Sequence, residues 1–501
     1  MMKYMREKQI LNSFLKEKTV YYFLIIIATI LFCMGSYLNP FSTHMPCTDE
    51  LVWLYIANGM HEGLIPYVDM FDHKGPLLYI IYYLGIGITG GAFWGVWVLI
   101  LLTMITSMIF CYKTTYILTA SNKISFISAL LVLTAFGYFT YMAGLKEVFA
   151  LPFIFISLYY FAKYIISNKI KTWELLIIGA AFACVLMITP TLAILWTIIL
   201  PYIIARSIIV NKSIKEVGKV FPILLGCLVI LLPQITYLHI HDALNAFVEC
   251  YITFNLEYSE EGFLSTLNAK RTLLKTILTT SSFIFAEIFI LISLFSKDKK
   301  KKELAVFSVI FYILTILVTC IIGNAYNHYM IVCIPCLCIP CAWGIECLSK
   351  ILETSTSNHW KILAILLICA GLIGYGGIYA GMWQTYNTNK YSNTLLTQDE
   401  ARVIEIIDAH TTNKDTIQVF ANKNYFYLAT ETTSATRFSY LPPTGYQKYN
   451  DEMLADINSN RPKIIVNSKS VSNSIMSHLS KDYRLIETCG IFEVYMRGDY
   501  E

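Results

Sequence analysis

Residues Thr48–Leu78 read TDELVWLYIANGMHEGLIPYVDMFDHKGPLL and form a polar, motif-bearing segment in an otherwise very apolar first half of the chain. Thr48 is a good helix N-cap, and Asp49 and Glu50 follow in the first turn, where the helix dipole favours negative charge. Gly59 and Gly63 end the helical pattern. The segment therefore predicts a short surface helix whose N-terminus keeps two carboxylates ionised, which suits a general base.

The other end of this segment predicts an anion site. Pro76 suits the first position of a second helix, from Leu77 to about Gly87. Lys74 then lies just ahead of a helix N-terminus, where backbone N–H groups and the helix dipole favour an anion such as phosphate. The same residues also fit a simpler interpretation, in which the acids cap a helix and the lysine is solvated.

The composition is that of a polytopic membrane protein. The chain has 501 residues, of which 56% are hydrophobic and 14% charged, and its mean hydropathy is +0.56. Soluble domains carry roughly 25% charged residues. The net charge is only +4, and Lys and Arg are spread over short loops instead of being gathered on one face, which argues against a nucleic-acid partner. The first apolar run, Val20–Leu38, is too long for a cleavable signal and predicts a membrane anchor.

The requirement of about 20 apolar residues per membrane helix gives about eleven candidate spans. They lie near residues 20–38, 93–112, 124–141, 148–166, 174–189, 191–208, 221–240, 276–296, 304–322, 329–348 and 362–383. The 174–208 region also reads as one helix broken near Pro190. Lys and Arg gather at the N-terminus and in alternate loops, which predicts a cytoplasmic N-terminus and, with an odd number of spans, an outer C-terminus.

From about residue 384 the composition becomes polar and the apolar runs shrink to strand length. We expect strands at 416–420, 463–466, 483–488 and 491–496, helices at 400–410 and 451–458, and a hairpin across Cys489-Gly490. The predicted organisation is a transmembrane catalytic domain over residues 1–383, with an outer loop at 39–92, and a soluble extracytoplasmic α/β domain over residues 384–501.

The first outer loop also carries a family resemblance. An Asp-Glu pair, a following surface helix and the segment Lys74-Gly75-Pro76-Leu77 resemble the GT-C fold glycosyltransferases. Within that fold the pattern is similar to protein O-mannosyltransferases and lipid A aminoarabinose transferases. The resemblance implies a polytopic enzyme that uses a polyprenyl-phosphate sugar at the outer face of the membrane.

The resemblance implies roles for particular residues. It makes Asp49 the catalytic base, with Glu50 beside it, and it places Lys74 on the lipid phosphate. Further substrate contacts are implied in the second and in a late outer loop, at Lys146, Glu147, Tyr326, His328 and Tyr329. The chain departs from the family in having Gly75 where Pro is common, and in having His73, another candidate contact, where an acid often precedes the lysine.

These outer-loop residues have alternatives. Lys146 and Glu147 also fit an interfacial charge pair, and His328 also fits an aromatic belt at the membrane surface. The long outer segment from residue 239 to 275 contains Lys270 and Arg271, which are candidates for holding phosphate because Arg binds phosphate bidentately. A loop charged for solubility explains them equally well.

Together these features predict an inverting glycosyltransferase that moves a monosaccharide from a polyprenyl-phosphate donor to a hydroxyl on a glycan, lipid or protein. An oligosaccharide ligase or polymerase with diphosphate-linked donors, or a lipid or solute transporter, remains an alternative. We expect no required cofactor, since no residues have metal-ligand spacing and the cysteines of Cys333–Cys341 lie in an apolar run. Dependence on a divalent metal stays open because the families differ in it.

Overall fold

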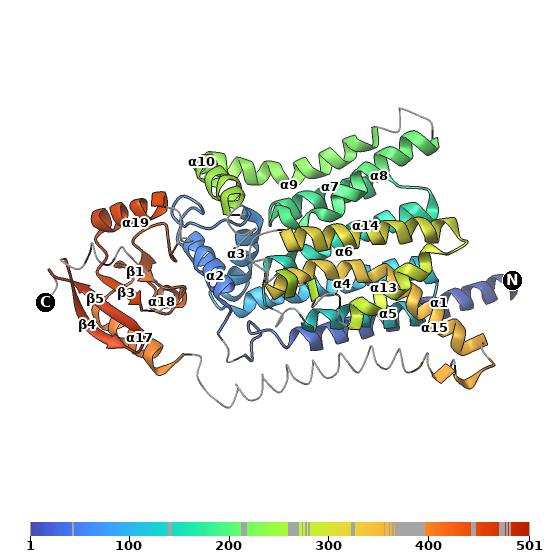
Figure 1. Ribbon diagram of the computed structural model, residues 1–501, viewed down its shortest axis with the longest axis horizontal. Helices are drawn as coiled ribbons and strands as arrows, with labels where there is room; N and C mark the ends of the chain where they lie inside the picture. Colours follow the sequence, from blue (N-terminus) through green and yellow to red (C-terminus); the bar gives the residue numbers. More distant parts are fainter. Residues whose placement is uncertain are drawn as a thin grey trace. The chain divides into compact units, whose positions relative to one another are not determined.

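The computed structural model describes residues 2–42, 45–138, 143–211, 218–258, 270–272, 274–275, 278, 281–321, 326–354, 356–359, 361–362, 365, 396–441, 447–469, 476, 479 and 482–499. The chain divides into two compact units that interleave in sequence (Figure 1). Unit 1 comprises Met1–Asn39, Val98–Gln234 and Leu256–Asn387, and unit 2 comprises Pro40–Trp97, Ile235–Asn255 and Thr388–Glu501.

Unit 1 is helical in its described parts. Its helices are α1 (Met2–Cys33), α4 (Trp94–Thr119), α5 (Asn122–Ala135), η1 (Phe136–Tyr138), α6 (Lys146–Ser167), α7 (Thr172–Leu186), η2 (Pro190–Leu192), α8 (Ile194–Asn211), α9 (Val220–Ile240), α13 (Ser281–Leu294), α14 (Lys299–Ile321), η5 (Asn327–Leu337) and α15 (Cys338–Thr354). The first residues of α4 and the last residues of α9 belong to unit 2.

Five helical stretches of the described chain are long and apolar enough to cross a membrane: Trp94–Thr119, Lys146–Ser167, Val220–Ile240, Lys299–Thr319 and His328–Thr354. Their surroundings differ, because His328–Thr354 is largely buried by other helices whereas α9 exposes apolar side chains such as Phe221 and Val229. Such an apolar exposed face suits lipid. The predicted polytopic class is confirmed, whereas the count of about eleven spans stays a prediction. The predicted span at 362–383 lies, apart from residues 362 and 365, outside the described residues.

The region 174–208 forms two helices rather than one. α7 ends at Leu186 and α8 begins at Ile194, with Pro190 opening the short η2 between them. α7 also packs very closely on α9, because a Cβ atom on Gly179 would lie 2.0 Å from the Ile223 carbonyl oxygen. Small residues at such crossings let helix backbones approach within a membrane.

Unit 2 begins with the two helices predicted from the first outer loop, α2 (Thr48–His61) and α3 (Pro76–Thr89). Pro76 occupies the first turn of α3, as predicted. The N-cap of α2 is Cys47 and not Thr48, since Glu50 at the third helical position accepts the Cys47 N–H. α10 (Leu244–Phe247) and the π-helix η4 (Val248–Thr253) also belong to unit 2.

The C-terminal part of unit 2 is a five-stranded sheet with helices. Its strands are β1 (Thr416–Phe420), β2 (Thr433–Ser434), β3 (Ile464–Ser468), β4 (Tyr483–Cys489) and β5 (Phe492–Arg497), in the order β2-β1-β3-β5-β4. β1 is parallel to β2 and β3, and β5 is antiparallel to β3 and β4. The helices are α17 (Gln398–His410), α18 (Tyr425–Ala429) and α19 (Gln447–Asn460).

The predicted small α/β fold of this part is confirmed. The β4–β5 hairpin turns at Gly490, whose φ of 58° is a left-handed conformation that other residues adopt only with strain. The sequence did not predict β2, because two residues carry no periodic signal. The boundary predicted between residues 383 and 384 lies outside the described residues and stays a prediction.

Candidate functional site

Asp49 and Glu50 open α2 but have different environments. Glu50 is fully buried, and its Oε2 accepts the Cys47 N–H at 2.8 Å. Asp49 is exposed. The capping contact of Glu50 fixes the start of the helix, so Asp49 is the carboxylate of this pair that a substrate can reach.

Asp72, in the turn between α2 and α3, is a buried carboxylate with several donors. Its Oδ2 accepts a hydrogen bond from the Trp53 indole N–H at 3.0 Å and lies 3.0 Å from the Tyr79 hydroxyl. Its Oδ1 accepts from the Tyr440 hydroxyl at 3.2 Å. Only 3% of Asp72 is exposed. A buried carboxylate with this many donors is fixed in position and stays charged.

Asp72, His73 and Lys74 form a row of interacting side chains. The Nδ1 atom of His73 lies 3.4 Å from Asp72 Oδ1, and Lys74 Nζ contacts His73 Nε2. Because an ammonium group only donates, Nε2 accepts and the ring proton resides on Nδ1, facing Asp72. Burial by itself raises the pKa of Asp72, but the charge of Lys74, the neighbouring His73 and the hydrogen bond from Tyr79 outweigh this effect, and the pKa lies below its usual value.

The backbone of the same turn is held from several sides. The Tyr67 hydroxyl donates to the Lys74 carbonyl at 2.7 Å, and the Tyr79 hydroxyl accepts the Lys74 N–H at 3.2 Å. Asn255, just after η4, donates its side-chain N–H to the His73 carbonyl at 2.8 Å. Lys74 itself is 8% exposed, so its ammonium is held inside unit 2 and not extended into solvent.

The start of α2 lies close to this turn. Asp49 and Trp53 are four residues apart and therefore share one face of α2. The Trp53 indole N–H bonds to Asp72, two residues before Lys74. The pKa of Tyr440 is raised first by burial and then by Asp72, and the charge of Asp49 also contributes. The two ends of the segment Thr48–Leu78, one with a reachable carboxylate and one with a lysine, thus lie in one neighbourhood.

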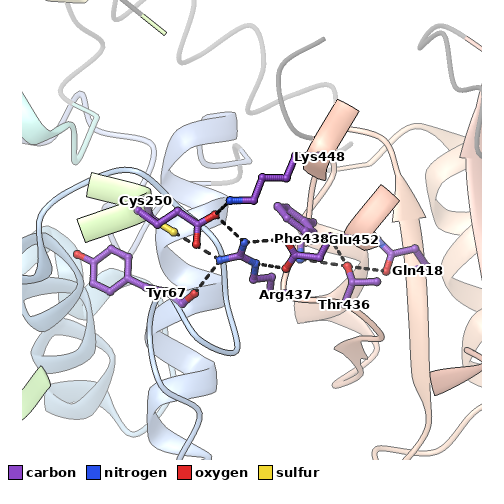
Figure 2. Close-up of polar contacts among 9 residues, drawn as sticks. Tyr67, Cys250, Gln418, Thr436, Arg437, Phe438, Lys448 and Glu452 are labelled. Atoms are coloured by element: carbon purple, nitrogen blue, oxygen red, sulfur yellow. Dashed lines mark hydrogen bonds and ion pairs between the residues drawn. The ribbon is translucent and has the colours of Figure 1, made fainter. Parts of the chain in front are cut away.

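Arg437 joins the C-terminal part of unit 2 to the turn and to η4 (Figure 2). Its guanidinium donates to both carboxylate oxygens of Glu452, at 2.5 and 2.8 Å, and to Glu249 at 3.4 Å. It also donates to the Tyr67 carbonyl at 3.3 Å. Lys448 donates to the same Glu249 oxygen at 2.8 Å. The positive charges of Arg437 and Lys448 therefore offset the negative charges of Glu249 and Glu452.

Five other predicted site residues lie together in unit 1. Lys146 Nζ lies 5.1 Å from the centre of the Tyr329 ring, a cation–π arrangement, and 3.7 Å from Glu147 Oε1. His328 stacks on Tyr326 and meets Tyr329 edge-on. Glu147 is 2% exposed, so this cluster places a buried carboxylate at the first turn of α6.

Arg271 also belongs to unit 1, where its side chain is exposed. Unit 2 thus holds Asp49, Glu50, His73 and Lys74, and unit 1 holds the remaining predicted residues. No group of three or more His, Cys, Asp or Glu side chains arranged for a metal ion occurs among the described residues.

Sequence reasoning did not identify Asp72, Tyr440 or Arg437. A signal for Asp72 was present, because it precedes Lys74 by two residues in a turn already singled out as an anion site. Arg437 and Tyr440 follow the turn by more than 360 residues, and no local pattern marks them.

Two family models cover most of the chain. The model for the N-terminal domain of the competence-induced protein Ccs4 matches residues 11–367, and the model for the Ccs4 C-terminal domain matches residues 397–497. No curated protein matches the sequence of the chain.

Solved structures of ArnT from Cupriavidus metallidurans have the same fold. The structure bound to undecaprenyl phosphate has a TM-score of 0.65 at 11% identity, over 96% of this chain and 99% of that chain. The apo structure has a TM-score of 0.63 at 12% identity, over 95% and 98% of the two chains. ArnT is a lipid A aminoarabinose transferase, so the predicted GT-C fold is confirmed.

Proposed function

Since the chain belongs to the family of the competence-induced protein Ccs4 and has the GT-C fold of ArnT, we propose that it is an inverting glycosyltransferase. Its donor is a polyprenyl-phosphate monosaccharide, and its acceptor is a hydroxyl at the outer face of the membrane. The similarity to a structure of ArnT bound to undecaprenyl phosphate supports this donor class.

In the proposed reaction Asp49 accepts the proton of the acceptor hydroxyl. The acceptor oxygen attacks the anomeric carbon from the face opposite the phosphate, a new glycosidic bond forms, and the bond from the anomeric carbon to the phosphate oxygen breaks. The polyprenyl phosphate leaves with the bonding electrons, and Lys74 stabilises the charge that develops on it. One base is sufficient because phosphate is a good leaving group, whereas glycoside hydrolysis normally requires two carboxylates.

Asp72 and His73 support this role of Lys74. His73 lies between the Asp72 carboxylate and the Lys74 ammonium and contacts both, so the row fixes the position of the lysine side chain. An incoming phosphate competes with His73 for the ammonium group, so donor binding and reorientation of the Lys74 side chain occur together.

One observation carries the proposal: unit 2 brings a reachable carboxylate, Asp49, close to the turn that contains a buried lysine, Lys74. A base and a phosphate-binding cation are the two groups that this reaction requires. The arrangement suits transfer from a phosphate-linked donor better than transport, because in transporters the ionisable groups usually lie near the bilayer midplane.

Asp49→Asn tests the proposal. The change keeps the shape of the side chain and removes its basicity, so we expect sugar transfer to fall by at least about 100-fold, as general-base catalysis contributes about 10²–10⁴-fold. The measurement is transfer from a radiolabelled undecaprenyl-phosphate sugar by the purified full-length protein. The matched control is Asp69→Asn, an exposed carboxylate of the same loop that accepts the Ile65 N–H.

Asp69→Asn is expected to retain wild-type transfer. Full activity of Asp49→Asn would contradict the assignment of the base. Export of labelled lipid by the wild-type protein without any covalent product would contradict the proposed function as a whole.

A further inference from the structure

A short segment of the C-terminal part of unit 2, Ser434–Tyr440, contacts the elements that carry the proposed site. At one end the Ser434 N–H donates to the Tyr55 hydroxyl of α2 at 3.0 Å. At the other end the Tyr440 hydroxyl donates to Asp72 at 3.2 Å. The segment therefore spans from α2 to the Asp72–Lys74 turn.

Arg437, in the middle of the segment, fixes the backbone that leads into this turn. Its carbonyl oxygen accepts the Phe71 N–H at 2.6 Å, and its guanidinium donates to the Tyr67 carbonyl at 3.3 Å. Tyr67 has a φ of 72°, a left-handed conformation that is strained in a residue other than glycine and persists only where neighbours enforce it. Arg437 is such a neighbour.

Tyr67 transmits this restraint to Lys74. Its hydroxyl donates to the Lys74 carbonyl at 2.7 Å, and the side chain is fully buried. A continuous path thus runs from Arg437 through both ends of Tyr67 to the backbone of Lys74. Tyr440 provides a second path, through Asp72 and His73, to the Lys74 ammonium.

The segment is rigid enough to act as a support. Gln418 of β1 is fully buried, donates to the Phe438 carbonyl at 2.9 Å and accepts from the Thr436 hydroxyl at 3.3 Å (Figure 2). The bidentate pair between Arg437 and Glu452 locks the guanidinium. The sheet therefore fixes the segment on one side, and polar groups of the segment contact the turn on the other.

We infer that Ser434–Tyr440 is a positioning segment of the donor site, in which Arg437 acts through Tyr67, and Tyr440 through Asp72, to hold Lys74 for the donor phosphate. This inference rests on the proposed function for the identity of the ligand. The C-terminal domain then takes part in donor binding, although it is far from Lys74 in the sequence.

Three variants of the full-length protein test the inference: Arg437→Lys, Arg437→Ala and Tyr440→Phe. Arg437→Lys keeps the charge opposite Glu249 and Glu452 but loses the planar fork that reaches Tyr67. The matched control is Arg402→Ala, which removes an exposed arginine of the same domain that pairs with Glu487.

The first readout, amide hydrogen exchange over residues 67–78, does not depend on any activity. We expect exchange in this peptide to accelerate by at least about 10-fold in both Arg437 variants and to stay unchanged in Arg402→Ala. The second readout is binding of undecaprenyl phosphate, measured by native mass spectrometry. We expect about 10-fold weaker binding in Tyr440→Phe and in both Arg437 variants, with the donor KM raised more than kcat is lowered.

The outcomes separate the two claims. Unchanged exchange and unchanged undecaprenyl phosphate binding in Arg437→Ala and Tyr440→Phe would overturn the positioning role while leaving the proposed function intact. Full rescue by Arg437→Lys would also overturn it, because a charge alone would then suffice. A wild-type protein that neither binds undecaprenyl phosphate nor transfers sugar would contradict the proposed function, and the exchange experiment would still decide whether the segment holds the turn.

Discussion

Lys74 has the environment of a positioned cation. It is buried, its backbone is bonded by Tyr67 and Tyr79, and its ammonium contacts His73. A lysine held in this way loses less conformational entropy when it binds an anion than an extended surface lysine does. Burial also strengthens its attraction to a phosphate, because the surroundings are less polarisable than water.

Lys74→Met tests the importance of this charge, since methionine keeps the apolar stem and removes the ammonium. We expect binding of undecaprenyl phosphate to weaken by roughly 10- to 150-fold, because a hydrogen bond to a charged group is worth about 1.5–3 kcal/mol. Native mass spectrometry of the purified protein measures the affinity, with Lys74→Arg as the variant that retains the charge. Wild-type affinity in Lys74→Met would place the phosphate elsewhere.

At the scale of residues, local chemistry made Asp49 and Lys74 candidates, because each lies at a predicted helix N-terminus. Their roles as base and phosphate contact came from the family resemblance and stay predictions. The contributions of Arg437 and Tyr440 depend on contacts between distant parts of the chain, and such contacts leave no spacing pattern in a single sequence.

Among the elements, η4 and α19 are linked mainly by charge. Glu249 of η4 pairs with Arg437 and with Lys448, the second residue of α19. Burial by itself raises the pKa of Glu249, but the hydrogen bond from Lys448 and the charge of Arg437 outweigh it and lower the pKa below its usual value. The link between these helices therefore depends on pH.

The sign of this dependence follows from the lowered pKa. A carboxylate whose folded-state pKa lies below its unfolded value, about 4.3 for Glu, stabilises the fold above that pH and loses this contribution as the pH falls through the folded-state pKa. We expect Glu249→Gln to unfold at a lower temperature than wild type at pH 7, and the difference to shrink towards zero below about pH 4. Scanning fluorimetry from pH 7 to 3 measures it, and a constant difference would contradict the assignment.

The helices and strands themselves were largely predictable. Pro76 marked the start of α3, the change in composition marked the C-terminal sheet, and Gly490 marked a hairpin. α10 and η4 were not predicted, because their short helical turns lie in a segment without clear periodicity. Contacts such as that between Asn255 and His73 stabilise this segment from outside its own sequence.

For the whole molecule, unit 2 gathers three separate stretches of chain: Pro40–Trp97, Ile235–Asn255 and Thr388–Glu501. The polytopic membrane class followed from composition, because apolar runs of membrane length have few alternatives. The GT-C fold followed instead from the family resemblance of Thr48–Leu78. Composition did not predict which loops pack with the C-terminal domain, because it does not determine contacts between loops.

The orientation predicted from basic loops has a direct test. We expect the N-terminus to be cytoplasmic and the C-terminal domain to lie outside, because Lys and Arg concentrate at the N-terminus and in alternate loops, and basic loops usually face the cytoplasm. Alkaline phosphatase fused after Glu501 is expected to be active. Green fluorescent protein is expected to be dark when fused after Glu501 and to fluoresce when fused ahead of Met1. A fluorescent C-terminal fusion would reverse the orientation.

The hydrogen bond from Tyr440 to Asp72 joins residues 368 positions apart. At about 5–20 residues per second, a ribosome reaches Tyr440 roughly 20 to 70 s after it has added Asp72. During that interval the contacts from Trp53 and Tyr79 are already available to the turn, but those from Arg437 and Tyr440 are not. The Asp72–Lys74 turn thus gains its contacts from Arg437 and Tyr440 only near the end of synthesis. By then the membrane helices that precede the C-terminal domain have already been made.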